Sequence, residues 1–149
     1  MAPPASEFVS ILSNFLQGGG LAESQTRLDM LDDMISPDVK FEVVGEDSPI
    51  ACNTQGLDNM KRFITDNLVP FSSAIVDKPS FEIVRAVGSQ DNPWIAFEFK
   101  SKGTSKAGKP YENNGVWMLR IDDTNKVAEA KGFMDTGHLQ RHFIECKGL

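Results

Sequence analysis

Apolar residues recur with a helical period in the first half of the chain. Three segments place them at the spacing of one face of an amphipathic helix. These positions are Phe8, Ile11, Leu12, Phe15 and Leu16 in the first segment, Leu28, Leu31 and Ile35 in the second, and Leu57, Met60, Ile64 and Leu68 in the third. Gly18–Gly20 end the first helix, and Pro37 and Pro70 end the other two, because these residues disfavour helix continuation. We therefore predict three N-terminal helices.

The remaining segments have the two-residue period of β-strands. Strands are predicted over 39–44, about 73–87, 93–102, 111–121 and 126–134, and a short last helix carries Leu139, Phe143 and Cys146 on one face. Pro79 predicts an irregularity in the second strand, and Pro49 excludes a central strand from the polar segment 45–56. The acidic turn at 122–125 joins the last two strands as a hairpin. This order predicts a single α+β domain over residues 1–149, with helices packed on a strongly curved, mostly antiparallel sheet that forms a cone with a pocket.

Composition and motifs restrict the classes of partner and cofactor that this chain can be expected to bind. The 149 residues carry a net charge of −6, which argues against a nucleic-acid partner because phosphate binding needs a concentrated basic face. No apolar run approaches the roughly 20 residues of a membrane span, and the N-terminus lacks the pattern of a signal peptide, so we expect a soluble cytoplasmic protein. Cys52 and Cys146 are predicted to be free thiols. No group of residues has metal-ligand spacing and no nucleotide-binding motif occurs, so no metal or cofactor is expected.

Several short motifs resemble those of one protein superfamily. The run 108–113 (GKPYEN) is similar to the G-x-x-Y-x-N that begins a late strand in ketosteroid-isomerase-related, SnoaL-like proteins. Lys126-Val127 matches the K-I that opens their last strand, and 131–136 (KGFMDT) is similar to their closing R-E-Y-x-D-T. The chain thus resembles the SnoaL-like proteins of the nuclear transport factor two-like superfamily. The resemblance implies a pocket for a small hydrophobic molecule and a homodimer whose sheets pack back to back.

One position departs from the resemblance. Where SnoaL-like cyclases and enzymes like limonene-epoxide hydrolase often carry an acidic residue in the last strand, this chain has Gly132. Either the acid has moved to another strand, or the protein only binds its ligand.

Glu98 is the leading candidate for a displaced acid. It lies in the aromatic run 94–100 (WIAFEFK), and alternation places Trp94, Glu98 and Lys100 on one face. A carboxylate desolvated by aromatic rings has a raised pKa, which suits a general acid, and Lys100 could hold a substrate oxygen. In the alternative orientation, the opposite apolar face forms the core and the two charges are solvated.

The other candidates are spread over three strands and the last helix. Asp135 either takes part in acid/base chemistry or caps the last helix. His138, in the first turn of that helix, has the side chain best suited to proton transfer near neutral pH. The further candidates for contact with a ligand are Phe41, Glu42, Tyr111, Asn114, Trp117 and Met134.

These observations predict an acid/base enzyme that acts without a cofactor on an apolar, oxygenated small molecule of polyketide or terpenoid type. Cyclisation, isomerisation, dehydration and epoxide opening all fit, since each needs a dry pocket, a proton donor or acceptor and a polarised oxygen. Secondary metabolism is the expected setting. The alternative is a binding module without catalysis, either a small-molecule carrier or a dimeric adaptor.

Overall fold

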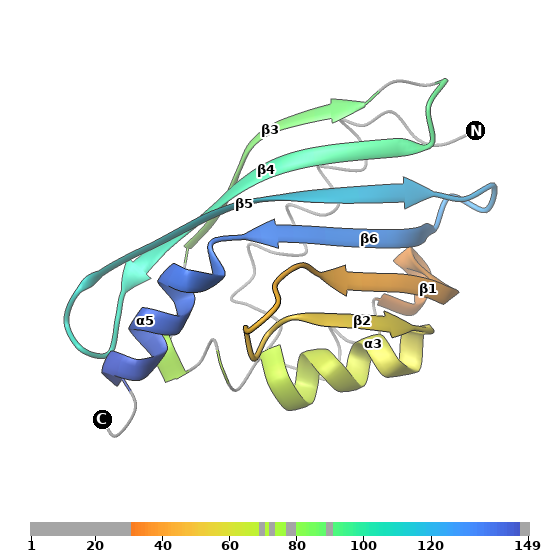
Figure 1. Cartoon of the computed structure of the whole chain (residues 1–149). Coiled ribbons are helices and arrows are strands. Elements are labelled where there is room, and N and C mark those ends of the chain that lie inside the picture. The colour runs from red at the N-terminus through yellow and green to blue at the C-terminus, as the bar shows by residue number, and fades with distance from the viewer. Residues whose placement is uncertain (1–30, 69–70, 72–73, 77–79, 89–90, 147–149) are drawn as a thin grey trace.

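A six-stranded sheet forms the centre of the molecule (Figure 1). The computed structural model describes residues 31–68, 71, 74–76, 80–88 and 91–146. The strands are β1 (Ile35–Val43), β2 (Cys52–Gln55), β3 (Ser80–Gly88), β4 (Trp94–Thr104), β5 (Pro110–Ile121) and β6 (Val127–Met134), in the order β2-β1-β6-β5-β4-β3. β1 and β6 run parallel, and the other neighbouring pairs run antiparallel.

Helical segments accompany the sheet at the sheet edge and at the end of the chain's described part. α3 (Leu57–Phe63) continues as a single π-helical turn, η2 (Ile64–Leu68), and both lie beside β1 and β2. α5 (Thr136–Cys146) follows β6 and lies near the end of the long, curved β4–β5 hairpin (Figure 1). The apolar spacing that predicts a helix after Gly56 and a short last helix is therefore confirmed.

Other predicted boundaries were wrong or lie outside the described residues. The expected strand at about 73–87 begins at Ser80, and Ala74 and Ile75 are helical. Pro79, the reason for expecting an irregularity, lies outside the described residues, and within β3 the register shifts between Ile83 and Arg85. β1 starts at Ile35, four residues earlier than expected, because Ile35 pairs with Val127 before the register shifts ahead of Lys40. The helix predicted from Phe8 lies outside the described residues.

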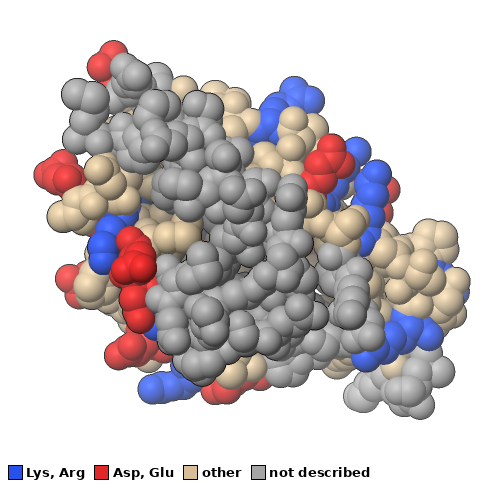
Figure 2. Space-filling view, turned by 180° about the vertical axis from the view of Figure 1, so that it is seen from behind, with Lys and Arg blue, Asp and Glu red and all other residues tan. Residues whose placement is uncertain are grey.

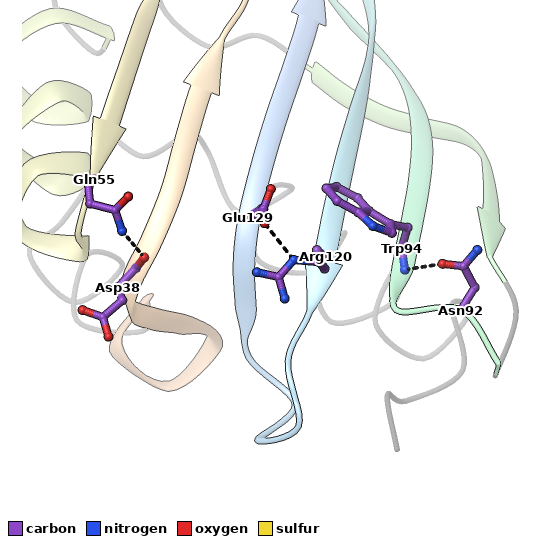
Figure 3. A network of polar contacts seen from close by, with 6 residues as sticks. All are labelled: Asp38, Gln55, Asn92, Trp94, Arg120 and Glu129. Atoms are coloured by element: carbon purple, nitrogen blue, oxygen red, sulfur yellow. Dashed lines mark hydrogen bonds and ion pairs between the residues drawn. The ribbon is translucent and has the colours of Figure 1, made fainter.

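β2 was not predicted from the sequence. It forms the sheet edge beside β1, with Cys52 opposite Val43 and Thr54 opposite Phe41. An edge strand needs ladder bonds on one side only, so a short polar segment can form one. Gln55 Nε2 also donates to the Asp38 carbonyl at 2.7 Å, as Figure 3 shows.

Polar contacts lie at one end of the sheet, where β4 and β6 begin and β5 ends. Arg120 Nε donates to Glu129 Oε1 at 2.9 Å between β5 and β6, and the Trp94 amide donates to Asn92 Oδ1 at 3.0 Å where β4 begins (Figure 3). In the turn between β5 and β6, Asp122 Oδ1 accepts from the Thr124 amide at 2.8 Å and from its hydroxyl at 2.6 Å. The predicted hairpin is confirmed.

The described surface carries both acidic and basic side chains, and both cysteines are free thiols. Side chains of both signs lie along the rim of the molecule in the view from behind, without a continuous basic face among the described residues (Figure 2). None of the described helices is long and apolar enough to cross a membrane. Cys52 and Cys146 are free, as predicted.

Candidate functional site

The two faces of β4 differ in burial. Ile95, Phe97 and Phe99 are only 3–5% exposed and belong to the core. Glu98 lies on the opposite face, where its Oε2 is 2.8 Å from Arg85 Nε and its side chain is 37% exposed. The structure therefore follows the second of the two orientations considered for this strand. We call the buried side the inner face and the other side the outer face.

Five of the residues proposed from the sequence share the outer face. They are Glu42, Trp94, Glu98, Lys100 and Asn114, as the strand register and the burial pattern place them. Their charges have surface partners: Lys100 Nζ is 3.8 Å from Glu112, and Glu42 is 3.5 Å from Lys131 Nζ. Exposed pairs of this kind are screened by water and contribute little to stability. On this face the Glu98 carboxylate is in contact with solvent.

Other proposed residues lie on the inner face, among them Phe41, Trp117 and Met134. Phe41 on β1 is 4% exposed, whereas Trp117 on β5 and Met134 on β6 are only partly buried. The Phe41 and Trp117 rings are nearly parallel, with an interplanar angle of 22° and centroids 5.6 Å apart. Met134 packs against both apolar clusters of the molecule, so it marks their junction.

At Gly132, where the resemblance led us to expect an acidic residue, the structure leaves no room for a side chain. Gly132 lies on the inner face of β6 opposite Trp117. A Cβ at this position would be 2.7–2.8 Å from three atoms of the Trp117 ring, closer than real contacts allow. The indole thus occupies the space where a side chain of residue 132 would begin.

At the α5 end of the inner face, three polar rings converge. The Tyr111 ring lies 5.7 Å from that of His138 and 5.3 Å from that of His142, and the two imidazoles are 4.5 Å apart. These are the only tyrosine and the only two histidines of the chain. His138 Nε2 and His142 Nδ1 are buried and have no hydrogen-bond partner within the part of the chain that the structure describes. Because buried polar atoms are normally paired, these nitrogens are candidates for contact with a ligand.

Asn113 and Asp135 hold α5 against the sheet at this point. The buried Asn113 donates from Nδ2 to the Asp135 carbonyl at 3.1 Å and accepts at Oδ1 from the Asp135 amide at 3.2 Å. Asp135 Oδ1 accepts from the His138 amide at 2.9 Å, so Asp135 caps the helix. Of its two interpretations, the cap is the one that this geometry supports.

Burial shifts the pKa values of Tyr111 and His142. Burial raises the pKa of the Tyr111 phenol to about 12, although its hydrogen bond with Asn113 acts in the opposite direction. The phenol is therefore a hydrogen-bond donor rather than a base at neutral pH. Burial lowers the pKa of His142, and the neighbouring His138 lowers it further. A neutral imidazole has a lone pair that can accept a proton.

We define the inner site as Trp117, Met134, Tyr111, His138 and His142. The sequence pointed to the first four but not to His142, nor to the part that Asn113 plays in holding α5. The spacing of four residues between His138 and His142 on a predicted helix was the available signal, since it places both on one face.

Two shallow hollows lie elsewhere, beside α3. One, of about 430 Å³, is lined by residues of β2, α3 and η2, including Gln55, Asn59 and Arg62. The other, of about 450 Å³, is lined by Asp32, Pro37 and the first residues of α3. Neither contains a residue of the inner site. Within the described ranges, no three His, Cys, Asp or Glu side chains lie close enough together to hold a metal ion.

Comparisons with solved structures place this geometry in a known fold. The chain superposes on a Jannaschia protein named as a SnoaL-like polyketide cyclase with a TM-score of 0.68, at 13% identity over 96% of this chain and 95% of that one. An NTF2-like protein from Burkholderia thailandensis gives a TM-score of 0.67 at 16% identity, over 95% and 98% of the two chains. The chain has the NTF2-like fold. The resemblance and the α+β architecture predicted from the sequence are thus confirmed.

Sequence comparison finds relatives of the NTF2-like chain among fungal cyclases. It is 26% identical over 108 residues to the dimerizing cyclase phiC of a fungal species, which is 72% of this chain and 46% of phiC. It is 30% identical over 54 residues to the dimerizing cyclase tstC of Talaromyces stipitatus, covering 36% and 24% of the two chains. The matches span less than half the length of these curated relatives. No protein-family model matches the chain.

Proposed function

We propose that the chain is an acid/base enzyme of the cyclase or isomerase type, acting without a cofactor on an apolar, oxygenated small molecule of secondary metabolism. The names of the two fungal relatives and of the SnoaL-like structural neighbour support ring formation. The inner face offers an aromatic surface for such a molecule, in Phe41 and Trp117. Apolar walls with a few convergent polar groups are typical of small-molecule sites.

The observation that carries this proposal is the convergence of Tyr111, His138 and His142 at one end of the inner face. Their buried nitrogens, which have no partner among the described residues, and the protonated phenol supply the proton acceptor and the hydrogen-bond donor of acid/base chemistry. His138 is partly buried, and its Nε2 is shielded from solvent, so we assign this nitrogen to contact with a substrate that replaces the missing hydrogen-bond partner.

A ring closure through an enolate uses these groups without any other reagent. His138 Nε2 removes a proton from a carbon next to a substrate carbonyl, and the Tyr111 hydroxyl donates a hydrogen bond to the enolate oxygen. The enolate carbon attacks a second carbonyl of the substrate, and the new alkoxide takes the proton back from His138. The carbon–carbon bond closes the ring with no net change in oxidation state.

Among the reactions considered, cyclisation and isomerisation have the most support. Both shift a proton between carbon and oxygen, which the Tyr111–His138 pair serves. The hypothesis of epoxide opening depended on the neighbouring charges of Glu98 and Lys100. These two side chains lie on the outer face, beside Arg85 and Glu112 respectively.

A carrier without catalysis is the second candidate. Among the described strand residues that face inward, none is an aspartate or a glutamate. An inner face without carboxylates suits simple binding of an apolar molecule. Turnover separates the two candidates, because a carrier binds its ligand and releases it unchanged.

A homodimer through the outer face belongs to the same proposal. Val116, Met118 and Phe133 are 37–40% exposed on neighbouring strands there, and Val87 on β3 is 67% exposed. Exposed apolar residues gathered on one sheet face are typical of an interaction surface. The acidic and basic side chains around them, such as Glu42 and Lys131, could pair across a two-fold axis.

The test begins with a thermal-shift screen of oxygenated polyketides, epoxides and terpenoids. Each stabilising compound is then incubated with wild type, Tyr111→Phe, His138→Gln and Glu98→Gln, and the products are analysed by mass spectrometry. Loss of an oxyanion donor lowers kcat by about 100- to 1000-fold, so Tyr111→Phe should lose most turnover. His138→Gln should lose a similar amount, and Glu98→Gln should stay near wild type.

Two results would count against the enzyme. Full turnover by Tyr111→Phe and by His138→Gln, together with loss of turnover in Glu98→Gln, would show that the reaction takes place on the outer face. Binding without any conversion by wild type would favour the carrier.

A further inference from the structure

Trp117 has an unusual position for a large aromatic residue in a sheet. Its ring extends from β5 over the neighbouring strand β6, where Gly132 leaves room for it. Three consecutive atoms of the six-membered ring lie almost equally far, 2.7–2.8 Å, from the place that a Cβ of Gly132 would occupy. Near-equal distances mean that the ring turns a face, rather than an edge, to the backbone of β6.

The opposite face of the indole is therefore directed away from the sheet. Phe41, on β1 beyond β6, stacks with the indole: the two ring planes differ by 22° and their centroids are 5.6 Å apart. The two rings differ in burial: Phe41 is 4% exposed, whereas Trp117 keeps accessible surface although its strand position faces inward. The accessible part of this surface is thus contributed by Trp117.

We propose that Trp117 is the specificity-determining residue of the inner site, and that its partly accessible indole selects planar, conjugated ligands over saturated, puckered ones. The proposal rests on the proposed function only for the location of the ligand. Aromatic stacking adds a preference beyond the burial of apolar area, about two- to tenfold in affinity for one ring pair. A puckered ring cannot make this contact because its axial hydrogens hold its carbons away from the indole.

The spacing along β5 adds a requirement on ligand length. Trp117 and Tyr111 are six residues apart on the same strand, which is up to roughly 20 Å in an extended conformation. Met134, opposite Gly115, lies between them. A ligand that stacks on Trp117 and reaches the Tyr111–His138 end is therefore elongated as well as flat, such as a fused-ring or polyene compound with an oxygen at its end.

A matched pair of small probes tests the selectivity without any need for turnover. 1-Naphthol and decahydro-1-naphthol have the same carbon skeleton and hydroxyl, but the first is flat and the second is puckered. Dissociation constants for both are measured by calorimetry on the full chain, as wild type, Trp117→Leu, Trp117→Phe and Trp94→Phe. Trp94, the only other tryptophan, lies on the outer face and provides the control.

Wild type should bind the flat probe better than the puckered one, and Trp117→Leu should reduce this ratio about two- to tenfold. Trp117→Phe, which keeps a ring in a smaller side chain, should keep part of the ratio, and Trp94→Phe should leave it unchanged. Circular dichroism checks that each variant is folded, and Trp117→Phe keeps the test informative if Trp117→Leu does not fold.

Three outcomes would overturn the proposal: an unchanged ratio in both Trp117 variants, a ratio that depends on Trp94, or no binding of the flat probe to wild type. These outcomes are distinct from failure of the proposed function. Loss of acid/base activity leaves the ratio intact, whereas an active enzyme with no preference for the flat probe refutes only the role of Trp117.

Discussion

At the residue scale, two glycines allow aromatic rings to cover the inner face. Gly132 makes room for Trp117, and a Cβ at Gly115 would lie 2.6–2.7 Å from the Phe99 ring and 2.2 Å from the Phe133 carbonyl oxygen. Each glycine lies directly opposite the aromatic residue on the neighbouring strand: Gly132 opposite Trp117, and Gly115 opposite Phe99. The dense aromatic packing of this fold thus depends on residues with no side chain.

A double-mutant cycle tests the packing at Gly132. Gly132→Ala should destabilise the protein by about 1–3 kcal/mol, the usual cost of overpacking, because the new methyl group meets the indole. In a Trp117→Leu background the same substitution should cost much less, since the ring is gone. Urea unfolding of the four proteins measures the coupling. Equal costs of Gly132→Ala in both backgrounds would show that the indole does not occupy this space.

The sequence could not decide the direction of Glu98, because both faces of the segment 94–100 carry bulky apolar or aromatic residues. Alternation fixed which residues share a face but not which face is buried. The sequence showed Gly132 as a departure from the resemblance but not the reason for it. The reason is the ring of Trp117, which is 15 residues away in the sequence and opposite Gly132 in the sheet.

At the scale of elements, the docking of α5 forms the polar end of the inner site. The sequence predicted this helix from local spacing and gave the cap as one of two roles for Asp135. It did not predict the reciprocal hydrogen bonds of Asn113, which join residues 22 positions apart. β2 was missed for a related reason: its pairing with β1 stabilises a segment whose own composition favours a turn.

Asn113 and Asn114 provide a matched pair for testing this docking. Asn113→Ala removes two partly buried hydrogen bonds to Asp135 and should cost about 1–3 kcal/mol of unfolding free energy. Asn114→Ala, the neighbouring amide on the exposed outer face, should stay within about 0.5 kcal/mol.

Hydrogen exchange locates the effect of the Asn113 substitution. The amides of α5 should exchange faster in Asn113→Ala than in wild type, while those of α3 keep their protection. Equal stability of the two alanine variants, or faster exchange throughout the sheet, would be at odds with a local docking role.

At the scale of the whole molecule, the sheet separates two kinds of surface. The inner face carries the aromatic rings and the polar cluster, whereas the outer face combines ion pairs with exposed apolar residues. An enzyme of this construction would bind its substrate on one side of the sheet and its second copy on the other. Substitutions on the outer face should then change assembly without changing the ligand site.

Assembly is tested with charged substitutions on two exposed apolar residues. Met118→Glu places a carboxylate within the outer face and should convert the proposed dimer into a species of 16.4 kDa in sedimentation at micromolar concentration. Ile144→Glu is the control, because Ile144 is 61% exposed on α5, outside the sheet. A wild-type protein that sediments as a monomer, or an equal effect of both substitutions, would refute the outer-face dimer.

The central claim is that the ligand binds at the Tyr111–His138 end of the inner face, and nuclear magnetic resonance of the histidine rings tests it most directly. The chain has only two histidines, so ¹⁵N-labelled imidazoles give signals that His138→Gln assigns without ambiguity. A compound that stabilises the protein in the thermal-shift screen is titrated into wild type. We predict that the ring nitrogens of His138 shift strongly and those of His142 follow. Unchanged imidazole signals during saturable binding would contradict the claim and place the ligand elsewhere on the molecule.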